Sequence, residues 1–526
     1  MKKIKIAIIG SGPSSVAASY YALENYKNIQ IDMIDVSSLP PKDINIFEEG
    51  NIKSRNDFLF KIYQLKNLNF KKSDKYFFGS DYVYDDKNLN IKKDKFLNFN
   101  VSFAKGGLGN VWGANLSVFN DNDIKDKWPF KISKLNKYYD FVKKLIYVSA
   151  EIDDMDKYSV YKLFDKYDFQ LSQQTSFIYS NYKRNQSNLL SQNIKMGRAK
   201  LSVNNSVKNL SCLGCGLCMY GCPHKKIFNP RYFIDEKLSK KFNFNFYPNI
   251  YVNKFKEENN KVLLNVKNLI TKKKLELTYD KVFIGAGPIS SALIAKLSNT
   301  SKNKKIILND SSKILFPLFL TKRIKNSTNE LNVSLAQLAI NISDLKSTNK
   351  SVHIQIYPYN DIFISTLFNF LNPKIVRIIE LIFKPLFDRF LIGMIYFHSD
   401  DSSKMSLSVD KINNNLSIYG KKSNKIKLIF REVRKLLNKN KKNLGFYIPP
   451  FIYRTNKIGN GQHFGSNLPM KKKPKDNQTD INGKLFGSTN CYFIDSSVLP
   501  SIPAQPPTYT LMANSARIID IALGSQ

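Results

Sequence analysis

The feature that most constrains the fold is a glycine-rich turn near the start of the chain. An apolar run from Ile4 to Ile9 leads into Gly10-Ser11-Gly12-Pro13-Ser14-Ser15, which is followed by a helical pattern from Ser14 to Leu23 and a second apolar run from Ile29 to Asp35. Strand, glycine turn, helix and strand in this order open a doubly wound α/β domain, in which helices connect parallel strands. The sequence therefore predicts an α/β fold built on such a domain.

The same turn has the form of a dinucleotide-binding fingerprint. Gly10 permits the tight turn, and Gly12 lets a pyrophosphate approach the positive end of the following helix. Ser15 replaces the third glycine, but it is small enough for close helix packing. Asp35 ends the second strand, where a carboxylate can accept hydrogen bonds from an adenosine ribose. This pattern alone does not distinguish FAD from NAD. The predicted cofactor-binding residues of this region are Gly10, Gly12, Pro13, Ser14, Ser15 and Asp35.

Size and charge narrow the class of protein. A chain of 526 residues with 43% hydrophobic content can bury a large core over two or three domains. The net charge of +39 arises mostly from Lys spread along the whole length, together with many Asn and Ile, which indicates a bias in residue usage. No nucleic-acid-binding motif accompanies the charge, so we expect no nucleic-acid partner.

Four of the five cysteines form the strongest local motif. Cys212-x-x-Cys215-x-x-Cys218-x-x-x-Cys222-Pro223 has the ferredoxin spacing, in which thiolates surround an iron–sulfur cluster. The four are too closely spaced for a disulfide framework, which indicates metal ligands in a reducing compartment. In two-cluster ferredoxins the fourth Cys serves a second cluster, so Cys222 either completes a 4Fe-4S cluster here or is left out of a 3Fe-4S cluster. Zinc, or a loop without metal, remains the alternative.

Three further segments have the character of cofactor contacts. Gly106 to Ala114 is a second glycine-rich loop. Val282-Phe283-Ile284 runs into Gly285-Ala286-Gly287-Pro288, which is another strand followed by a glycine turn. Near the end of the chain, Asn490 to Pro500 reads as a closing strand that contains Asp495.

Through these segments, in this order, the chain resembles the glucose-methanol-choline (GMC) oxidoreductases along most of its length. The resemblance implies FAD, with the loop from Gly106 beside the isoalloxazine ring and Asp495 near the flavin. Some relatives attach the flavin covalently through a His, and Val111 stands at that position here, so we expect dissociable FAD. The cofactor-binding residues that the resemblance adds are Gly106, Gly107, Gly109, Asn110, Val111, Trp112, Gly285, Ala286, Gly287, Asp495 and Ser496.

Oxidation of an alcohol needs a base over the flavin, because the hydroxyl proton must leave as hydride moves to flavin N5. His463, in Gly-Gln-His-Phe-Gly-Ser, is the candidate by resemblance. Relatives carry a His or Asn as its partner, but the matching position is Pro506, whose side chain can neither donate nor accept. Gln505 is the nearest group that could orient an alcohol, and we include it as a catalytic candidate.

The resemblance to cluster-bearing sugar dehydrogenases of this family implies a 3Fe-4S cluster, and with it a route for electrons out of the flavin. We therefore expect a dehydrogenase acting on CH-OH groups of an alcohol, sugar or polyol, with an electron-acceptor protein or quinone as partner. The alternatives are an oxygen-using alcohol oxidase with a structural cysteine loop, and a non-catalytic electron-transfer or scaffold flavoprotein.

The rest of the sequence predicts how the chain divides into domains. Phe244 to Lys281 predicts a β-meander, and residues 38–100 predict surface excursions with short elements. We expect an FAD-binding domain in three parts and a discontinuous substrate-binding domain. The boundaries are 1–125 and 201–310 (FAD-binding, the second with the cysteine loop), 126–200 (substrate-side insertion), 311–440 (substrate-binding) and 441–526 (FAD-binding, with the catalytic motif).

Two features of the sequence bear on where the protein is located in the cell. The apolar run at the start is short and ends in the glycine turn, so we expect a strand of a cytoplasmic protein and not a signal peptide. Asp361 to His398 is apolar and aromatic, but charged residues such as Lys374 and Arg377 interrupt it, and it cannot span a bilayer. It predicts core and lid helices. The alternative is a basic amphipathic face on an anionic membrane, peripheral on its inner side.

Overall fold

The fold is described from a computed structural model of the chain. The structure describes residues 3–39, 57, 60, 82–83, 89, 91–157, 159–165, 169–204, 212–218, 222–298, 305–361, 372–410 and 415–524. Most of the predicted surface excursion at 38–100, and the part of the apolar segment between 362 and 371, lie outside these residues.

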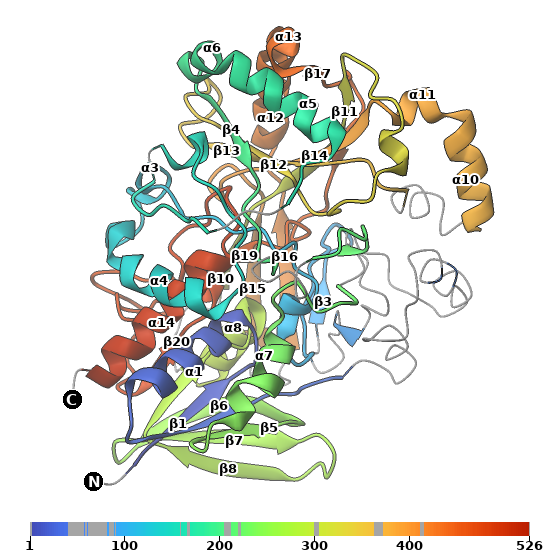
Figure 1. The fold of residues 1–526 in the computed structure, drawn as a ribbon. Helices are drawn as coiled ribbons and strands as arrows, with labels where there is room; N and C mark the ends of the chain where they lie inside the picture. The colour runs from blue at the N-terminus through green and yellow to red at the C-terminus, as the bar shows by residue number, and fades with distance from the viewer. Residues whose placement is uncertain are drawn as a thin grey trace.

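A five-stranded parallel sheet forms the base of the molecule, in the order β20-β9-β1-β2-β5 (Figure 1). The strands are β1 (Ile4–Ile9), β2 (Ile29–Ile34), β5 (Phe244–Tyr247), β9 (Lys281–Ile284) and β20 (Cys491–Phe493). All four neighbouring pairs are parallel. The strand–turn–helix–strand prediction is confirmed, because α1 (Pro13–Asn25) connects β1 to β2.

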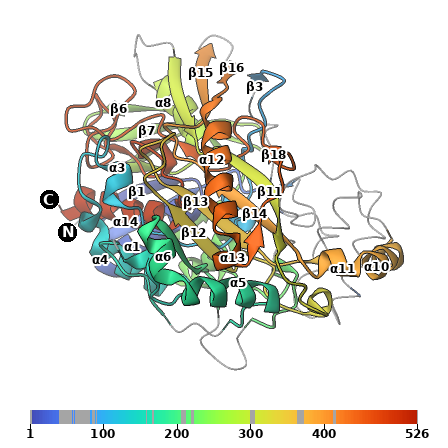
Figure 2. The same cartoon turned by 90° about the horizontal axis from the view of Figure 1, so that it is seen from above.

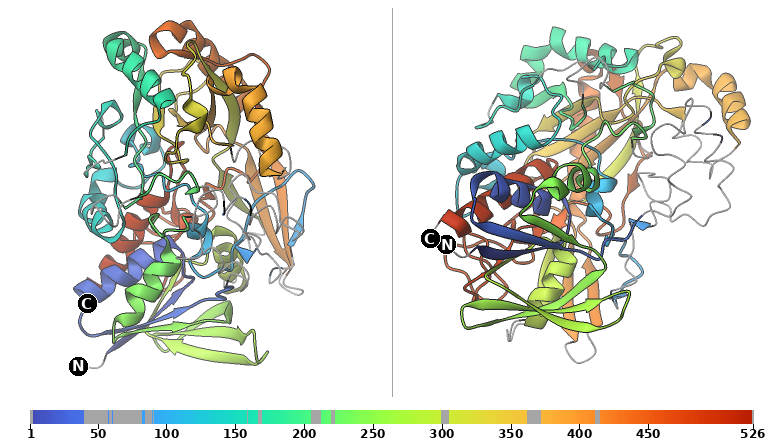
Figure 3. Two further views of the ribbon diagram at one scale, coloured as in Figure 1. Left: turned by 45° about the vertical axis from the view of Figure 1, so that its right-hand side comes forward. Right: turned by 60° about the horizontal axis from the view of Figure 1, so that its bottom comes forward.

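Helices and a meander cover this sheet. Pro at the first helical position starts α1, since proline suits that position. The helix α14 (Thr508–Gly524) packs against α1 and against α4 (Asn136–Leu145), so both ends of the chain lie on the same side (Figures 1 and 3). The predicted meander is confirmed from Ile250 as an antiparallel sheet of β6 (Ile250–Glu258), β7 (Lys261–Asn268) and β8 (Lys274–Tyr279). Its predicted start at Phe244 is wrong, because Phe244–Tyr247 pairs with β2 as the parallel strand β5.

A seven-stranded antiparallel sheet forms the upper part of the molecule. Its path is β17-β11-β14-β13-β12-β4, and β18 pairs with β11. The strands are β4 (Ile194–Arg198), β11 (Lys313–Leu320), β12 (Leu338–Ile342), β13 (Val352–Tyr357), β14 (Phe390–Tyr396), β17 (Phe446–Tyr447) and β18 (Arg454–Thr455). The helices at the top of the molecule in Figure 1 are α5 (Gln173–Arg184), α6 (Gln186–Ser191), α12 (Lys425–Lys439) and α13 (Lys441–Leu444).

A third sheet lies between the two parts. Its order is β19-β10-β15-β16-β3, in which β16 and β3 are parallel and the other pairs are antiparallel. The strands are β3 (Ile91–Lys93), β10 (Lys305–Asp310), β15 (Lys404–Asp410), β16 (Asn415–Lys421) and β19 (Phe464–Gly465). Separate apolar cores fill the three regions.

The remaining helices are short. They are α3 (Asp121–Ile124), α7 (Pro230–Glu236), α8 (Pro288–Ser298), which follows β9, and the pair α10 (Pro373–Ile382) and α11 (Lys384–Phe387). The pair α10–α11 stands at the edge of the molecule, where α11 contacts β14 (Figures 1 and 2). Within the described part of the chain, no helix has the length and apolar character needed to cross a bilayer.

Candidate active site

A pocket of about 230 Å³ lies where the parallel sheet meets the upper part of the molecule. Three predicted turns reach it together, from the ends of β1, β9 and β20. The amide of Gly10 donates to Ile34, that of Gly285 to Ile9, and that of Ile494 to Ile284. Since the carboxyl ends of parallel strands meet at one edge, segments far apart in the sequence form one site.

Close packing explains why glycine and serine occupy the first turn. Gly10 has φ +91°, and a Cβ there would lie 2.4 Å from the carbonyl oxygen of Gly285. A Cβ on Gly285 would in turn lie 2.3 Å from Oγ of Ser15. Ser15 thus occupies the position where the helix approaches the second glycine turn, as expected for a small residue at the third fingerprint position.

The glycine-rich loop that begins at Gly106 lies against the first glycine turn, at Gly10 to Ser15. The amide of Gly106 donates to Oγ of Ser11 over 2.8 Å, and Nδ2 of Asn110 donates to the carbonyls of Lys105 and Gly107. A Cβ on Gly109 would overlap Pro230, at 2.6 Å. Gly107, Gly109 and Trp112 line the pocket, whereas Gly106, Asn110 and Val111 shape the loop behind it. The side chain of Val111 is buried.

Two features suit this pocket to a dinucleotide such as FAD. Among the described residues, no atom lies within 4 Å of a Cβ built on Gly12 or Gly287, so the backbone at both turns is open to a ligand. Ser290 lines the same pocket, and its buried hydroxyl has no hydrogen-bond partner in the described part of the chain. A buried hydroxyl without a partner is costly, and a cofactor atom would satisfy it.

Asp35 is one of the residues that line this pocket. Its carboxylate accepts from the amide of Ser37 and interacts with Ser11, and burial raises its pKa to about 7. This position at the end of β2 is the one expected for a ribose-binding carboxylate.

Asp495 holds two walls of the pocket together. It accepts from Oγ of Ser291 at 2.5 Å and from the amide of Ser497 at 2.9 Å. Burial raises its pKa, against the opposing effect of these hydrogen bonds. Because Ser291 belongs to α8 and Asp495 to the loop after β20, the carboxylate fixes one element against the other. Asp495 and Ser496 line the pocket.

His463 also lines this pocket. Its ring stacks on Tyr396, with 4.8 Å between ring centroids and 21° between planes. Its carbonyl accepts from the amide of Ser311, and the preceding loop lies on Asp310, which accepts from Gly459. The imidazole is therefore held between β14 and the end of β10, facing the pocket that the glycine turns enter.

Three pocket residues from the seven-stranded sheet were not predicted from the sequence. They are Lys313 at the start of β11, Gln355 on β13 and Tyr396 on β14. Tyr357 donates to Oε1 of Gln355 over 2.7 Å, so this amide oxygen is already used within the wall. No local motif marks these residues, since they come together only through strand pairing such as Lys313 with Tyr396.

Gln505 does not line this pocket. It lines a neighbouring cavity of about 60 Å³, where His353 also lies. Its Nε2 donates to Asp123 over 3.2 Å. The main pocket is lined instead by the next residues of the loop, Pro506, Pro507 and Thr508. The catalytic role of Gln505 therefore stays a prediction, and its contacts are those of a loop support.

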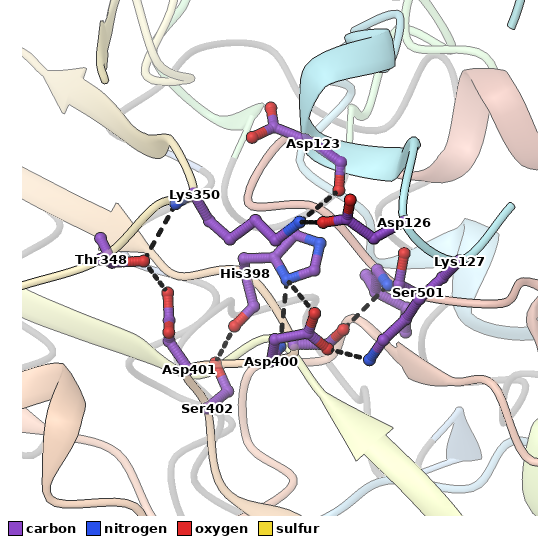
Figure 4. A network of polar contacts seen from close by, with 12 residues as sticks. Asp123, Asp126, Lys127, Thr348, Lys350, His398, Asp400, Asp401, Ser402 and Ser501 are labelled. Carbon is purple, nitrogen blue, oxygen red and sulfur yellow. Dashed lines mark hydrogen bonds and ion pairs between the residues drawn. The ribbon is translucent and has the colours of Figure 1, made fainter. Parts of the chain in front are cut away.

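A buried polar network that includes Asp123, the partner of Gln505, lies beside the loop of Gln505 (Figure 4). Lys350 bonds to Asp126 over 2.8 Å and contacts the carbonyl of Asp123, and the amide of Asp400 donates to Nδ1 of His398. Burial lowers the pKa of His398. Two hydrogen bonds between Ser399 and Ile502 attach the network to the segment that leads to Pro506.

The four cysteines of the motif lie in one loop, but they are not arranged as a metal site. Burial raises the pKa of Cys212 to about 11, and neighbouring cysteines add to this effect. Sγ of Cys222 accepts from the amide of Lys226 over 3.2 Å. In the described part of the chain, no group of three or more His, Cys, Asp or Glu side chains is placed to hold a metal ion. The predicted cluster is therefore not confirmed.

The position of the cysteine loop is nevertheless informative. Cys212 and Cys218 pack against the same apolar cluster as Trp112 and Tyr396. Both aromatic residues also line the main pocket. One layer of side chains thus separates the loop from the pocket.

The C-terminal part of the chain matches a known family. Residues 420–515, which include His463 and Asp495, match the family model described as GMC oxidoreductase. Around the pocket, the fold combines a parallel sheet with a seven-stranded antiparallel sheet.

Solved structures also resemble this chain, and one of them is similar to it over almost the whole length. It is the crystal structure of pyridoxine 4-oxidase from Mesorbium loti, with a TM-score of 0.60, 10% identity and 98% coverage of each chain. At this identity the match shows the fold. A search of curated proteins finds no match.

Proposed function

We propose that this protein binds FAD without a covalent link and oxidises a CH-OH group of a small alcohol. One observation carries the proposal: His463 faces the same pocket that the open glycine turns at Gly12 and Gly287 enter. The family-model match over residues 420–515 supports it, since this stretch contains His463. FAD bound in this pocket would accept the hydride that leaves the carbon.

The chain's own residues supply binding and proton transfer. Gly10, Gly12 and the start of α1 would hold the pyrophosphate, and Asp35 the ribose. Asp495 keeps α8 in place along the pocket. His463 would take the hydroxyl proton, and stacking on Tyr396 keeps its ring oriented. Val111 offers no group for a covalent bond to the flavin.

The decisive experiment is anaerobic reduction of the purified protein by a panel of alcohols, sugars and polyols, followed by flavin absorbance. We expect bleaching by one class of compound. We expect His463→Asn to keep its flavin and to be reduced about 10²- to 10⁴-fold more slowly. A variant that is reduced as fast as the wild type would remove His463 from the mechanism.

The electron acceptor is a separate proposal. We favour a dehydrogenase that passes electrons to a protein or quinone, with the four cysteines as ligands of an iron–sulfur cluster. Support comes from their spacing, from the backbone hydrogen bond to Sγ of Cys222 and from the packing of the loop beside Trp112 and Tyr396. Because the described side chains do not form a metal site, ligation would require the thiols to move closer together and to lose their protons.

The competing acceptor is oxygen. The solved structure with this fold carries the name of an oxidase, which keeps that alternative open. Iron and sulfide analysis after anaerobic purification, with Cys218→Ser as the comparison, tests the cluster. Hydrogen peroxide formed at the rate of alcohol oxidation in air, without iron in the protein, would favour the oxidase. Flavin that no alcohol reduces would favour a scaffold flavoprotein.

A further inference from the structure

The helix pair α10–α11 exposes a run of large apolar side chains at the edge of the molecule. We call this set the α10–α11 apolar face. Its members and their exposed fractions are Ile375 (45%), Ile378 (55%), Leu381 (67%), Ile382 (66%), Phe383 (50%) and Leu386 (47%). Single exposed apolar residues are ordinary, but a contiguous group of this size marks an interaction surface.

These side chains are not needed for the local core. Val376 and Phe387, on the other side of the helix pair, are 4% and 9% exposed and pack with Tyr359. The rings of Tyr359 and Phe387 are 5.2 Å apart, and the hydroxyl of Tyr359 donates to Glu380 over 2.6 Å. One side of the helix pair thus anchors it to the protein, and the other presents a second apolar surface to solvent.

Among the described residues, the exposed charges of the helix pair and its flanks are basic. Lys374 and Arg377 belong to α10, and Arg389 follows α11. The carboxylate of Glu380 accepts from Tyr359, and Asp388, just after α11, is fully buried and bonds to Arg323. The turn Ser327–Asn329 contacts α11, and the segment before it adds exposed Lys322 and Lys325. An apolar face with a basic border fits a lipid surface that carries negative charge.

The face is also connected to the cysteine loop. Asn360, next to the anchoring Tyr359, donates to the carbonyl of Gly216 over 3.1 Å. The loop exposes Leu213, at 70%, and the next residue, Gly214, lies beside the backbone of Leu331, which is 63% exposed. The hydrogen bond from Asn360 thus ties the segment that anchors α10–α11 to this loop.

We infer that the α10–α11 apolar face docks the protein on an anionic lipid bilayer. The helix α10 has ten residues, which is far too short to span a membrane, so it would lie in the plane of the interface. Ile378, Leu381 and Ile382 would enter the boundary of the acyl chains, while Lys374 and Arg377 would contact lipid phosphates.

The test is cosedimentation of the flavin-loaded protein with vesicles of phosphatidylglycerol and phosphatidylcholine, and with vesicles of phosphatidylcholine alone. We expect binding to the anionic vesicles that weakens with salt. Ile378→Asn with Ile382→Asn, and separately Lys374→Glu with Arg377→Glu, should each weaken it about tenfold or more. Flavin content and the rate of flavin reduction in solution should stay at the wild-type level.

Matched controls separate this face from the general positive charge. Ile270→Asn removes a 71% exposed side chain from the β7–β8 turn, and Lys273→Glu with Lys274→Glu reverses two exposed charges there. Both controls should bind vesicles like the wild type. Equal loss in controls and α10 variants would show diffuse attraction and overturn the inference, as would absence of wild-type binding at low salt. A dimer that Ile378→Asn with Ile382→Asn dissociates, seen by sedimentation velocity, would assign the face to a second copy instead.

Discussion

Two glycines of the first turn differ in what constrains them, although only one residue separates them. Gly10 is fixed by its positive φ and by the carbonyl of Gly285. Gly12 has an ordinary φ of −69° and open space where a Cβ would stand. The fold therefore constrains the first glycine, and we predict that ligand binding constrains the second.

This difference predicts opposite effects of two alanine substitutions. Gly10→Ala should destabilise the cofactor-free protein by about 1–3 kcal/mol, because the side chain is strained at that φ and meets backbone atoms. Gly12→Ala should leave the melting temperature unchanged and weaken FAD binding, because its methyl group occupies the approach to the backbone. Thermal unfolding and a flavin titration measure the two effects. A loss of stability in Gly12→Ala would contradict the assignment.

Asp310 makes stability depend on pH. It is 1% exposed, and burial raises its pKa to about 7. Between about pH 4 and pH 7, the native state holds a proton on Asp310 that the unfolded chain, with an aspartate pKa of about 3.9, has released. The contribution of Asp310 to the free energy of unfolding is therefore largest at low pH and falls as pH rises toward 7.

The corresponding variant is Asp310→Asn, which is neutral at every pH. Between about pH 4 and pH 7, Asp310 alone should lower the free energy of unfolding by about 1.4 kcal/mol per pH unit. Relative to the wild type, the variant should gain stability over this range. Denaturant unfolding of the cofactor-free protein from about pH 5 to about pH 8 measures this. Parallel pH profiles for the two proteins would show that Asp310 is already ionised.

At the scale of elements, two neighbouring serines at the start of α8 have different surroundings. Ser291 donates to the buried Asp495 and so ties the helix to the loop after β20. Ser290 lines the pocket, and its buried hydroxyl has no partner among the described residues. Ser291 thus positions the helix, and we predict that Ser290 contacts the cofactor.

Substitution of these serines should separate the two functions. Ser291→Ala should cost about 1–3 kcal/mol of stability, because a buried carboxylate loses a donor. Ser290→Ala, which removes the same atom one residue earlier, should not lower the stability of the cofactor-free protein, because the hydroxyl has no partner there, and should weaken FAD binding. Thermal unfolding of the cofactor-free variants and a flavin titration measure the two effects. Equal stability losses would show that both hydroxyls support the helix.

At the scale of the whole molecule, the pocket joins parts that have separate cores. Gly10 belongs to the parallel sheet, Lys313 to the seven-stranded sheet and His463 to the segment before β19. A ligand that fills the pocket contacts all of them. We therefore expect FAD to stabilise the chain as one unit.

The expected increase in the free energy of unfolding follows from mass action. At an FAD concentration one hundred times the dissociation constant, the gain is about 2.7 kcal/mol. It should appear as a concentration-dependent rise in a single melting transition. Two transitions, of which FAD shifts only one, would show that the upper part does not respond to the cofactor.

The sequence by itself determined the elements whose signals are local. The glycine turns after β1 and β9 need residues that permit positive φ or close approach, and such needs can be read from residue type and spacing. The α/β class, the meander and the pocket-lining positions of Gly12, Asp35, His463 and Asp495 were predicted in this way or by resemblance. The cysteine spacing predicts a cluster that the described side chains do not form.

Tertiary structure alone decided the rest. Lys313, Gln355 and Tyr396 line the pocket because antiparallel pairing sets β11, β13 and β14 in register, and no short-range pattern encodes register between distant strands. The same holds for Gln505, which directly precedes the pocket-lining Pro506 in the sequence but donates to Asp123 in a neighbouring cavity. From its sequence alone, the apolar segment after residue 361 could either pack in a core or lie on the surface. Only the packing of Val376 and Phe387 on Tyr359 shows which face of α10–α11 is left outside, because burial depends on what lies opposite a side chain in space.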